Sequence, residues 1–79
     1  MARTKHRVVN LSYFKVYVVT PESRPDHADP NTNVWLLSMR AAIGNAKQIA
    51  EAARVDMFVH EFVYDDGTFI YTGRTVVIR

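Results

Sequence analysis

The fold of this chain depends on residues 33–54, which read NVWLLSMRAAIGNAKQIAEAAR. Apolar side chains recur in this stretch at alternating spacings of four and three residues, from Trp35 to Ala53, and Arg40 and Lys47 lie on the opposite side. That spacing is typical of an amphipathic helix with one face directed at a core. The pattern therefore predicts one long helix over the whole stretch.

A second interpretation stays open because Gly44 interrupts the helical pattern, and a glycine inside a helix costs roughly 1 kcal/mol relative to alanine. In this interpretation residues 34–41 form a strand with alternate side chains facing inward, and only residues 45–54 are helical. The long helix is preferred because, at a rise of ~1.5 Å per residue, its length matches the strands that it would cover.

The segment that follows predicts a β-hairpin. Residues 57–64 and 68–78 are rich in apolar and aromatic side chains, and residues 65–67, Asp-Asp-Gly, separate them. An Asp-Gly pair tolerates the positive φ angles of a type I′ turn, whose twist suits two antiparallel strands. Gly73 lies inside the second strand, where glycine usually marks a bulge or a bend.

The length of the turn decides which side chains share a face. With Asp66 and Gly67 as a two-residue loop, one face carries the aromatic set Phe58, His60, Phe62, Tyr64, Phe69 and Tyr71. The other face then carries Val59, Glu61, Val63, Ile70 and Thr72. A three-residue loop with Gly67 in a bulge would shift the strands by one residue and mix the two sets. We expect the aromatic face to lie under the helix, because aromatic side chains bury the most area, and the other face to be only partly covered.

Three further segments precede the helix. Residues 8–19 alternate apolar and polar side chains at the period of two that a half-buried strand requires. Residues 20–32 contain all three prolines, a composition that suits neither a strand ladder nor a helix, and they are expected to form a long surface loop. Residues 1–7 are basic and form an amino-terminal arm.

These patterns predict a single α+β domain over residues 1–79, with an antiparallel sheet of three strands and one long helix packed on it, in the order βαββ. The alternative is ββαββ with a shorter helix. A chain of this length buries only about 60% of the surface that it exposes when unfolded, so a homodimer is a further expectation.

The absence of cysteine excludes disulfides and thiolate metal sites. The basic start of the chain is not followed by an uninterrupted apolar run. We therefore expect a cytoplasmic protein without a membrane span.

Residues that could carry chemistry are few. Asp26, His27 and Asp29 include metal-ligand types, but they lie in a proline-flanked loop without a fourth ligand, so no metal or other cofactor is expected. His60 and Glu61 are neighbours on a strand and point to opposite faces, which argues against an acid–base pair. No arrangement of nucleophile and base stands out, and the sequence predicts a protein that is not an enzyme.

The basic arm supports an alternative function in nucleic-acid binding. Arg3, Lys5 and Arg7 could contact phosphates, and Tyr13 and Tyr17 could stack on bases. The net charge of +2 is modest for a dedicated nucleic-acid binder, however. Nucleic acid is therefore the second choice of partner.

The alanine-rich segment AKQIAE, residues 46–51, leads into an exposed hairpin in a short chain without cysteine. From about Val34 onward this architecture resembles that of small phage-encoded proteins that bind and disable host machinery, such as anti-CRISPR proteins and polymerase inhibitors. The resemblance implies a protein that occludes a surface of a host complex, in the host cytoplasm, without catalysis. It rests on general architecture and implies no site residues.

The sequence therefore predicts a small non-catalytic module that binds a partner protein and occludes one of its surfaces. The expected contact surfaces are the long loop, the polar face of the helix and an unpaired strand edge. Aromatic and arginine side chains carry most of the binding energy in protein interfaces. The expected partner-binding residues are Tyr13, Tyr17, Arg24, Arg40 and Lys47.

Overall fold

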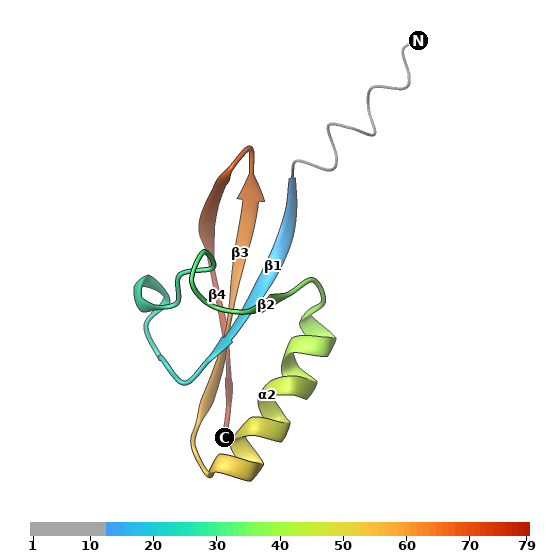
Figure 1. Cartoon of the computed structure of the whole chain (residues 1–79), viewed down its shortest axis with the longest axis vertical. Coiled ribbons are helices and arrows are strands. Elements are labelled where there is room, and N and C mark those ends of the chain that lie inside the picture. The colour runs from blue at the N-terminus through green and yellow to red at the C-terminus, as the bar shows by residue number, and fades with distance from the viewer. Residues whose placement is uncertain (1–12) are drawn as a thin grey trace.

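The computed structural model describes residues 13–79 and has one α-helix and a four-stranded antiparallel sheet (Figure 1). The elements along the chain are β1 (Tyr13–Thr20), the short 3-10 helix η1 (Pro25–His27), β2 (Trp35–Leu36), α2 (Met39–Ala53), β3 (Met57–Asp65) and β4 (Thr68–Ile78). The strands lie in the order β2-β1-β3-β4 across the sheet. The α+β class is confirmed, and the alternative order ββαββ with a shorter helix describes the fold better than the three-stranded form.

The helix predicted from Asn33 is wrong at its amino end. Trp35 and Leu36 form the short strand β2, which pairs with Val18 and Tyr17 of β1. The indole packs into the apolar cluster on the sheet face opposite to α2. One continuous helix would keep its apolar stripe on a single side of the sheet, so tertiary packing overrides the helical period at this point.

α2 begins instead at Met39, because Ser38 provides a cap. Ser38 has extended backbone angles, and its hydroxyl accepts a hydrogen bond from the Ala41 amide at 3.2 Å. Serine is among the preferred residues at this position, since it satisfies an amide that the helix leaves unpaired. The second interpretation is right that a strand precedes a shorter helix, but its bounds are wrong, because β2 contains two residues and Gly44 lies inside α2.

The hairpin of β3 and β4 confirms the two-residue loop. Asp65 pairs with Thr68, and Asp66 and Gly67 have positive φ angles of 50° and 90°. A type I′ turn requires positive φ at both central residues. The predicted register next to the turn is therefore the observed one, and the aromatic side chains of both strands share a face.

Farther from the turn, the ladder between β3 and β4 contains a bulge. Glu61 lies between the pairs His60↔Thr75 and Phe62↔Tyr71, so several β4 residues lie opposite it. These residues are Thr72, Gly73 and Arg74. The glycine has a φ of 97°, which residues with a side chain rarely adopt, and the bulge predicted there is confirmed.

The helix covers the face of the sheet that was expected to be partly bare. The buried Ala42 and Ala46 of α2 pack with Tyr17, Met57 and Val59. The small alanine side chains let the helix lie close to this valine- and methionine-bearing face. The expectation that the helix covers the aromatic face is therefore wrong.

The loop between β1 and β2 covers the aromatic face instead. Ala28 in this loop is buried and packs with Val16, Val18 and Phe62, and Trp35 extends the cluster. In Figure 1 the loop crosses the sheet on the side away from α2. The predicted loop lies at the surface with most of its residues exposed, and through Ala28 it also supplies the second layer of the core.

α2 reaches only part of the face on which it lies. Val76 and Ile78, near the end of β4, pack against the helix cluster. The turn of the hairpin lies beyond the amino end of α2 (Figure 1), and there Tyr13 and Ile70 are 58% and 53% exposed. Among residues 13–79, no element covers the half of this face that lies toward the turn.

Candidate functional site

The open half of the sheet is the candidate functional site, and we call it the tip face. It consists of the side chains that alternate onto the helix side of the sheet, beyond the helix itself. They are Tyr13 and Lys15 from β1, Glu61, Val63 and Asp65 from β3, and Thr68, Ile70, Thr72 and Arg74 from β4. The tip face therefore combines one aromatic and two aliphatic side chains with charges of both signs.

The apolar part of the tip face runs across three strands. Val63 of β3 lies opposite Ile70 of β4, and Tyr13 of β1, which pairs with Asp65, is a diagonal neighbour of Val63. Val63 is half-buried, and Ile70 and Tyr13 are exposed. Exposed apolar side chains on neighbouring strands, with charged residues among them, are typical of a surface that contacts another molecule.

The bulge brings two β4 side chains to the carboxylate of Glu61. The Thr72 hydroxyl donates a hydrogen bond to Glu61 Oε1 at 2.8 Å, and Arg74 Nη1 lies 3.7 Å from Oε2. Lys15 Nζ approaches the same Oε2 from β1 at 4.0 Å. Glu61 itself is only 4% exposed, and its Oε2 accepts no close hydrogen bond from residues 13–79.

This carboxylate is held in its ionised form. Burial by itself raises the pKa of Glu61, but the hydrogen bond from Thr72, the nearby Tyr17 hydroxyl and the charges of Lys15 and Arg74 outweigh burial and lower it below its ordinary value. Thr72 donates the close hydrogen bond to the carboxylate. The Tyr17 hydroxyl is near enough to stabilise the ionised form of Glu61, but it makes no close hydrogen bond to it. Glu61 is thus suited to holding two cations in place rather than to taking up a proton near neutral pH.

Tyr17 has the complementary shift. Burial, and then the nearby carboxylate of Glu61 with its negative charge, raise the pKa of the Tyr17 phenol, while Arg74 partly opposes them. Its hydroxyl therefore stays protonated next to the carboxylate. The ionised Glu61 and the protonated Tyr17 stabilise each other at the base of the tip face.

On the opposite face, His60 fixes the long loop to the sheet. His60 is fully buried, and its Nε2 lies 2.8 Å from the carbonyl oxygen of Glu22 in the loop. Because a carbonyl only accepts, Nε2 carries the proton. In the neutral ring Nδ1 then accepts from the Thr75 hydroxyl at 2.8 Å, and the Tyr71 hydroxyl donates to Thr75 at 2.6 Å. The histidine has a structural role, and it points away from Glu61, as the strand period predicted.

Two of the predicted partner-binding residues lie on β1 and differ in exposure. Tyr13 lies exposed on the tip face. Tyr17 is only 8% exposed and belongs to the core under α2, so its side chain is not accessible to a partner or a base in this structure.

The other predicted contact residues do not come together. Arg24 is exposed in the loop and pairs with Asp26 at 3.2 Å, whereas Arg40 and Lys47 are exposed on α2, over the other face of the sheet. The predicted nucleic-acid contacts Arg3, Lys5 and Arg7 lie outside the described residues.

The acidic residues of the loop have structural partners. Asp29 Oδ1 accepts hydrogen bonds from the amide and the side chain of Asn31 at 3.0 and 3.1 Å, and its carbonyl accepts from Asn33. Asparagine and aspartate commonly close turns in this way. Residues 13–79 contain no group of three histidine or acidic side chains that could hold a metal ion.

Sequence reasoning missed most of the tip face. Lys15, Glu61, Val63 and Arg74 belong to the alternating pattern that predicted the strands, but the pattern does not show where along a strand the helix stops. One signal was available, because a glycine inside a strand predicted a bulge, and a bulge redirects the side chains next to it.

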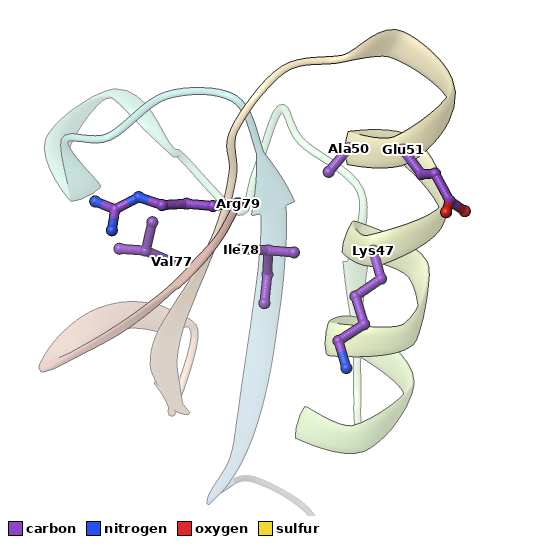
Figure 2. A pocket seen from close by; sticks show the side chains of 6 residues that line it. All are labelled: Lys47, Ala50, Glu51, Val77, Ile78 and Arg79. Carbon is purple, nitrogen blue, oxygen red and sulfur yellow. The ribbon is translucent and has the colours of Figure 1, made fainter.

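A shallow groove of about 560 Å³ lies between the carboxyl-terminal half of α2 and the end of β4. Its lining residues are Lys47, Ala50, Glu51, Val77, Ile78 and Arg79. In Figure 2 the side chains of Val77 and Arg79 point away from α2. The lining lacks the convergent polar groups that fix a small ligand, so the groove is a weaker candidate than the tip face.

No family model, curated protein or solved structure matches this chain. Within residues 13–79, α2 is too short and too polar to cross a lipid bilayer. The functional interpretation therefore depends on the geometry of the tip face.

Proposed function

We propose that the protein is a non-catalytic binding module that docks through its tip face on a partner protein and occludes the surface that it covers. The observation that carries this proposal is the half of the sheet that α2 leaves open, with Tyr13 and Ile70 exposed upon it. Tyrosine and arginine are enriched in protein interfaces, and both occur here.

The charges around Glu61 support this function in two ways. The side chains of Lys15 and Arg74 are 54% and 60% exposed, yet both are drawn to one buried carboxylate. Side chains that are already ordered lose less conformational freedom on binding. Two cations share a single anion, so a local excess of positive charge remains to attract carboxylates of the partner.

The two ends of the tip face carry charges of opposite sign, which gives a docked partner one preferred orientation. Asp65 and the neighbouring Asp66 place negative charge next to the turn, whereas Lys15 and Arg74 place positive charge nearer to α2. A partner with the reverse arrangement of charges would dock in one direction only. The architectural resemblance to small phage-encoded inhibitors supports occlusion of a host surface as the consequence of docking.

The test compares three forms of the full chain as immobilised baits. The wild-type protein, Ile70→Asp and the control Val34→Asp are incubated with a lysate of the cells in which the protein acts, and bound proteins are quantified by mass spectrometry. Val34 is 80% exposed and lies outside the tip face, so the control introduces the same charge elsewhere. We expect one protein that is retained by the wild type and by Val34→Asp and is lost with Ile70→Asp.

Two results would contradict the proposal. One is recovery of the bait alone, and the other is equal retention of the same protein by all three forms. Nucleic acid in the bound fraction, released by a modest increase in salt concentration, would favour the alternative function through the basic arm. Circular dichroism of each variant confirms that the fold is intact before the comparison is made.

A further inference from the structure

Among residues 13–79, the outer edge of β4 is unpaired, and it lies next to the tip face. β4 has β3 as its single neighbour among the described residues, and it is eleven residues long, whereas β2 at the opposite edge of the sheet has two. None of the β4 residues is fully buried. A strand in this position exposes a row of backbone donors and acceptors.

The turn geometry identifies which backbone groups are free. Asp65 and Thr68 flank the two-residue loop and form the hydrogen-bonded pair that closes it. Along an antiparallel ladder such pairs alternate with pairs whose N–H and C=O groups point away from each other. The backbone of Ile70 therefore faces β3, and the N–H and C=O groups of Phe69 and Tyr71 face outward.

The stretch from Thr68 to Thr72 lacks the features that usually protect a strand edge. It contains no proline and no charged residue, and the bulge at Gly73 follows it rather than interrupting it. Phe69 and Tyr71 are half-buried on one face and Ile70 is exposed on the other. This stretch is long enough for a short added strand, and both of its faces offer apolar contacts.

The charges next to the open stretch of β4 indicate the chemistry of the occupant. Arg74 is the one charged residue of β4, and Arg79, which is also positive, follows the end of the strand. Arg74 and Lys15 share the single carboxylate of Glu61. An extended segment that carries a carboxylate near Arg74 would relieve this excess of positive charge.

We propose that β4 binds its partner by strand addition, and that the occupant is an extended acidic segment of the partner protein with alternating apolar side chains. This inference rests on the proposed function for the existence of a partner and specifies how that partner is held. Main-chain hydrogen bonds to Phe69 and Tyr71 supply affinity, and contacts with Ile70 and Arg74 supply selectivity. The added strand widens the tip face by one strand.

The probe for this mode is a displayed library of random linear peptides of about twelve residues, selected on the full chain. We expect enriched peptides to alternate apolar residues and to carry Asp or Glu. Their affinity is then measured by fluorescence anisotropy on the chain made by total chemical synthesis, with the Phe69 amide N-methylated. This change keeps every side chain and removes one outward N–H.

N-methylation should weaken peptide binding about tenfold or more, because it removes one main-chain hydrogen bond and the methyl group clashes with the added strand. N-methylation of Ser23, in the loop on the aromatic face, is the matched control and should leave affinity unchanged. Enrichment of no peptide, or equal affinity for the Phe69-methylated and unmodified chains, would overturn strand addition.

The protein captured in the bait experiment separates this inference from the proposed function. If that protein is lost with Phe69 N-methylation, strand addition is supported. If the Phe69-methylated chain retains the protein but Ile70→Asp loses it, strand addition is wrong and docking through the tip face is still supported. Dimers seen by light scattering that disappear on Phe69 N-methylation would identify a second copy as the occupant and overturn the acidic partner.

Discussion

At the scale of single residues, the arrangement around Glu61 shows how a buried charge is kept in a small domain. The cost of burying the carboxylate is offset by one close hydrogen bond, from Thr72, and by two cations that reach it from different strands. Removing a partner from such a group costs more than the pair itself contributes, because the remaining charge stays buried. The pH dependence of stability should therefore report on this residue.

We predict that Glu61→Gln removes part of the acid sensitivity of the fold. The pKa of Glu61 is lowered on folding, so the unfolded state takes up a proton first, near its ordinary pKa of about 4.5. The stabilisation by the carboxylate is present above that pH and is lost as the pH falls through the folded pKa. Urea unfolding between about pH 3 and 7 should show a smaller fall in the free energy of unfolding for the variant, with a loss of about 2 kcal/mol at neutral pH.

Glu51→Gln is the control for this measurement, because Glu51 is exposed on α2. Its pH dependence should match that of the wild type. Parallel curves for wild type and Glu61→Gln would mean that the carboxylate gains no stabilisation on folding.

We predict that Thr75→Val weakens the attachment of the loop. Valine has nearly the same shape as threonine but leaves His60 Nδ1 and the Tyr71 hydroxyl without their shared partner. Unsatisfied buried polar groups should lower the free energy of unfolding by about 2 kcal/mol. Thr68→Val, at an exposed position of the same strand, should change it little, and urea unfolding of both variants decides the matter.

At the scale of elements, two features predict different starts for α2. The apolar spacing places the start near Trp35, whereas the capping residue Ser38 places it at Met39. The apolar stripe continues back to Trp35, yet the helix begins after Ser38. A side-chain cap satisfies an otherwise unpaired amide at that point, and the residues before it gain strand pairing with β1 instead. The helix is therefore shorter than its hydrophobic pattern.

We predict that Ser38→Ala destabilises the protein by about 1 kcal/mol, because alanine cannot accept the hydrogen bond from the Ala41 amide. Ser23→Ala in the exposed loop is the matched control and should have little effect. Thermal unfolding followed by circular dichroism measures both. Equal stability of the two variants would show that the helix does not depend on this cap.

At the scale of the whole molecule, two thin layers enclose one sheet. α2 covers part of one face, and the proline-containing loop, through Ala28, covers the other together with Trp35 of β2. The loop packs on aromatic side chains of the strands, but most of its own residues are exposed, so it is the layer that should open first.

We predict that Ala28→Asp detaches the loop while the hairpin and α2 persist. Ala28 is fully buried against Val16, Val18 and Phe62, and a carboxylate there would lack a partner. Hydrogen exchange followed by mass spectrometry should show faster exchange in residues 21–34, with increased binding of a hydrophobic dye. Ala41→Asp on the exposed side of α2 should show neither change.

Much of this architecture could be predicted from short stretches of the sequence. The hairpin and its register follow from the Asp66-Gly67 turn, and the bulge follows from Gly73, because positive φ is a property of single residues. The helical segment follows from a repeated spacing. Of the tip face, Tyr13 was the one residue predicted to contact a partner.

The sequence by itself determined β1, β3 and β4, the turn, the bulge and the existence of one helix, since these depend on neighbours along the chain. The tertiary structure alone decided which face α2 covers, where it stops, and that the loop is a core layer. Tyr13 and Tyr17 share a strand and a face, yet one is exposed and the other buried, because the helix reaches only the second. Alternation along a strand determines which face a side chain is on, and only packing of distant segments determines whether that face is covered.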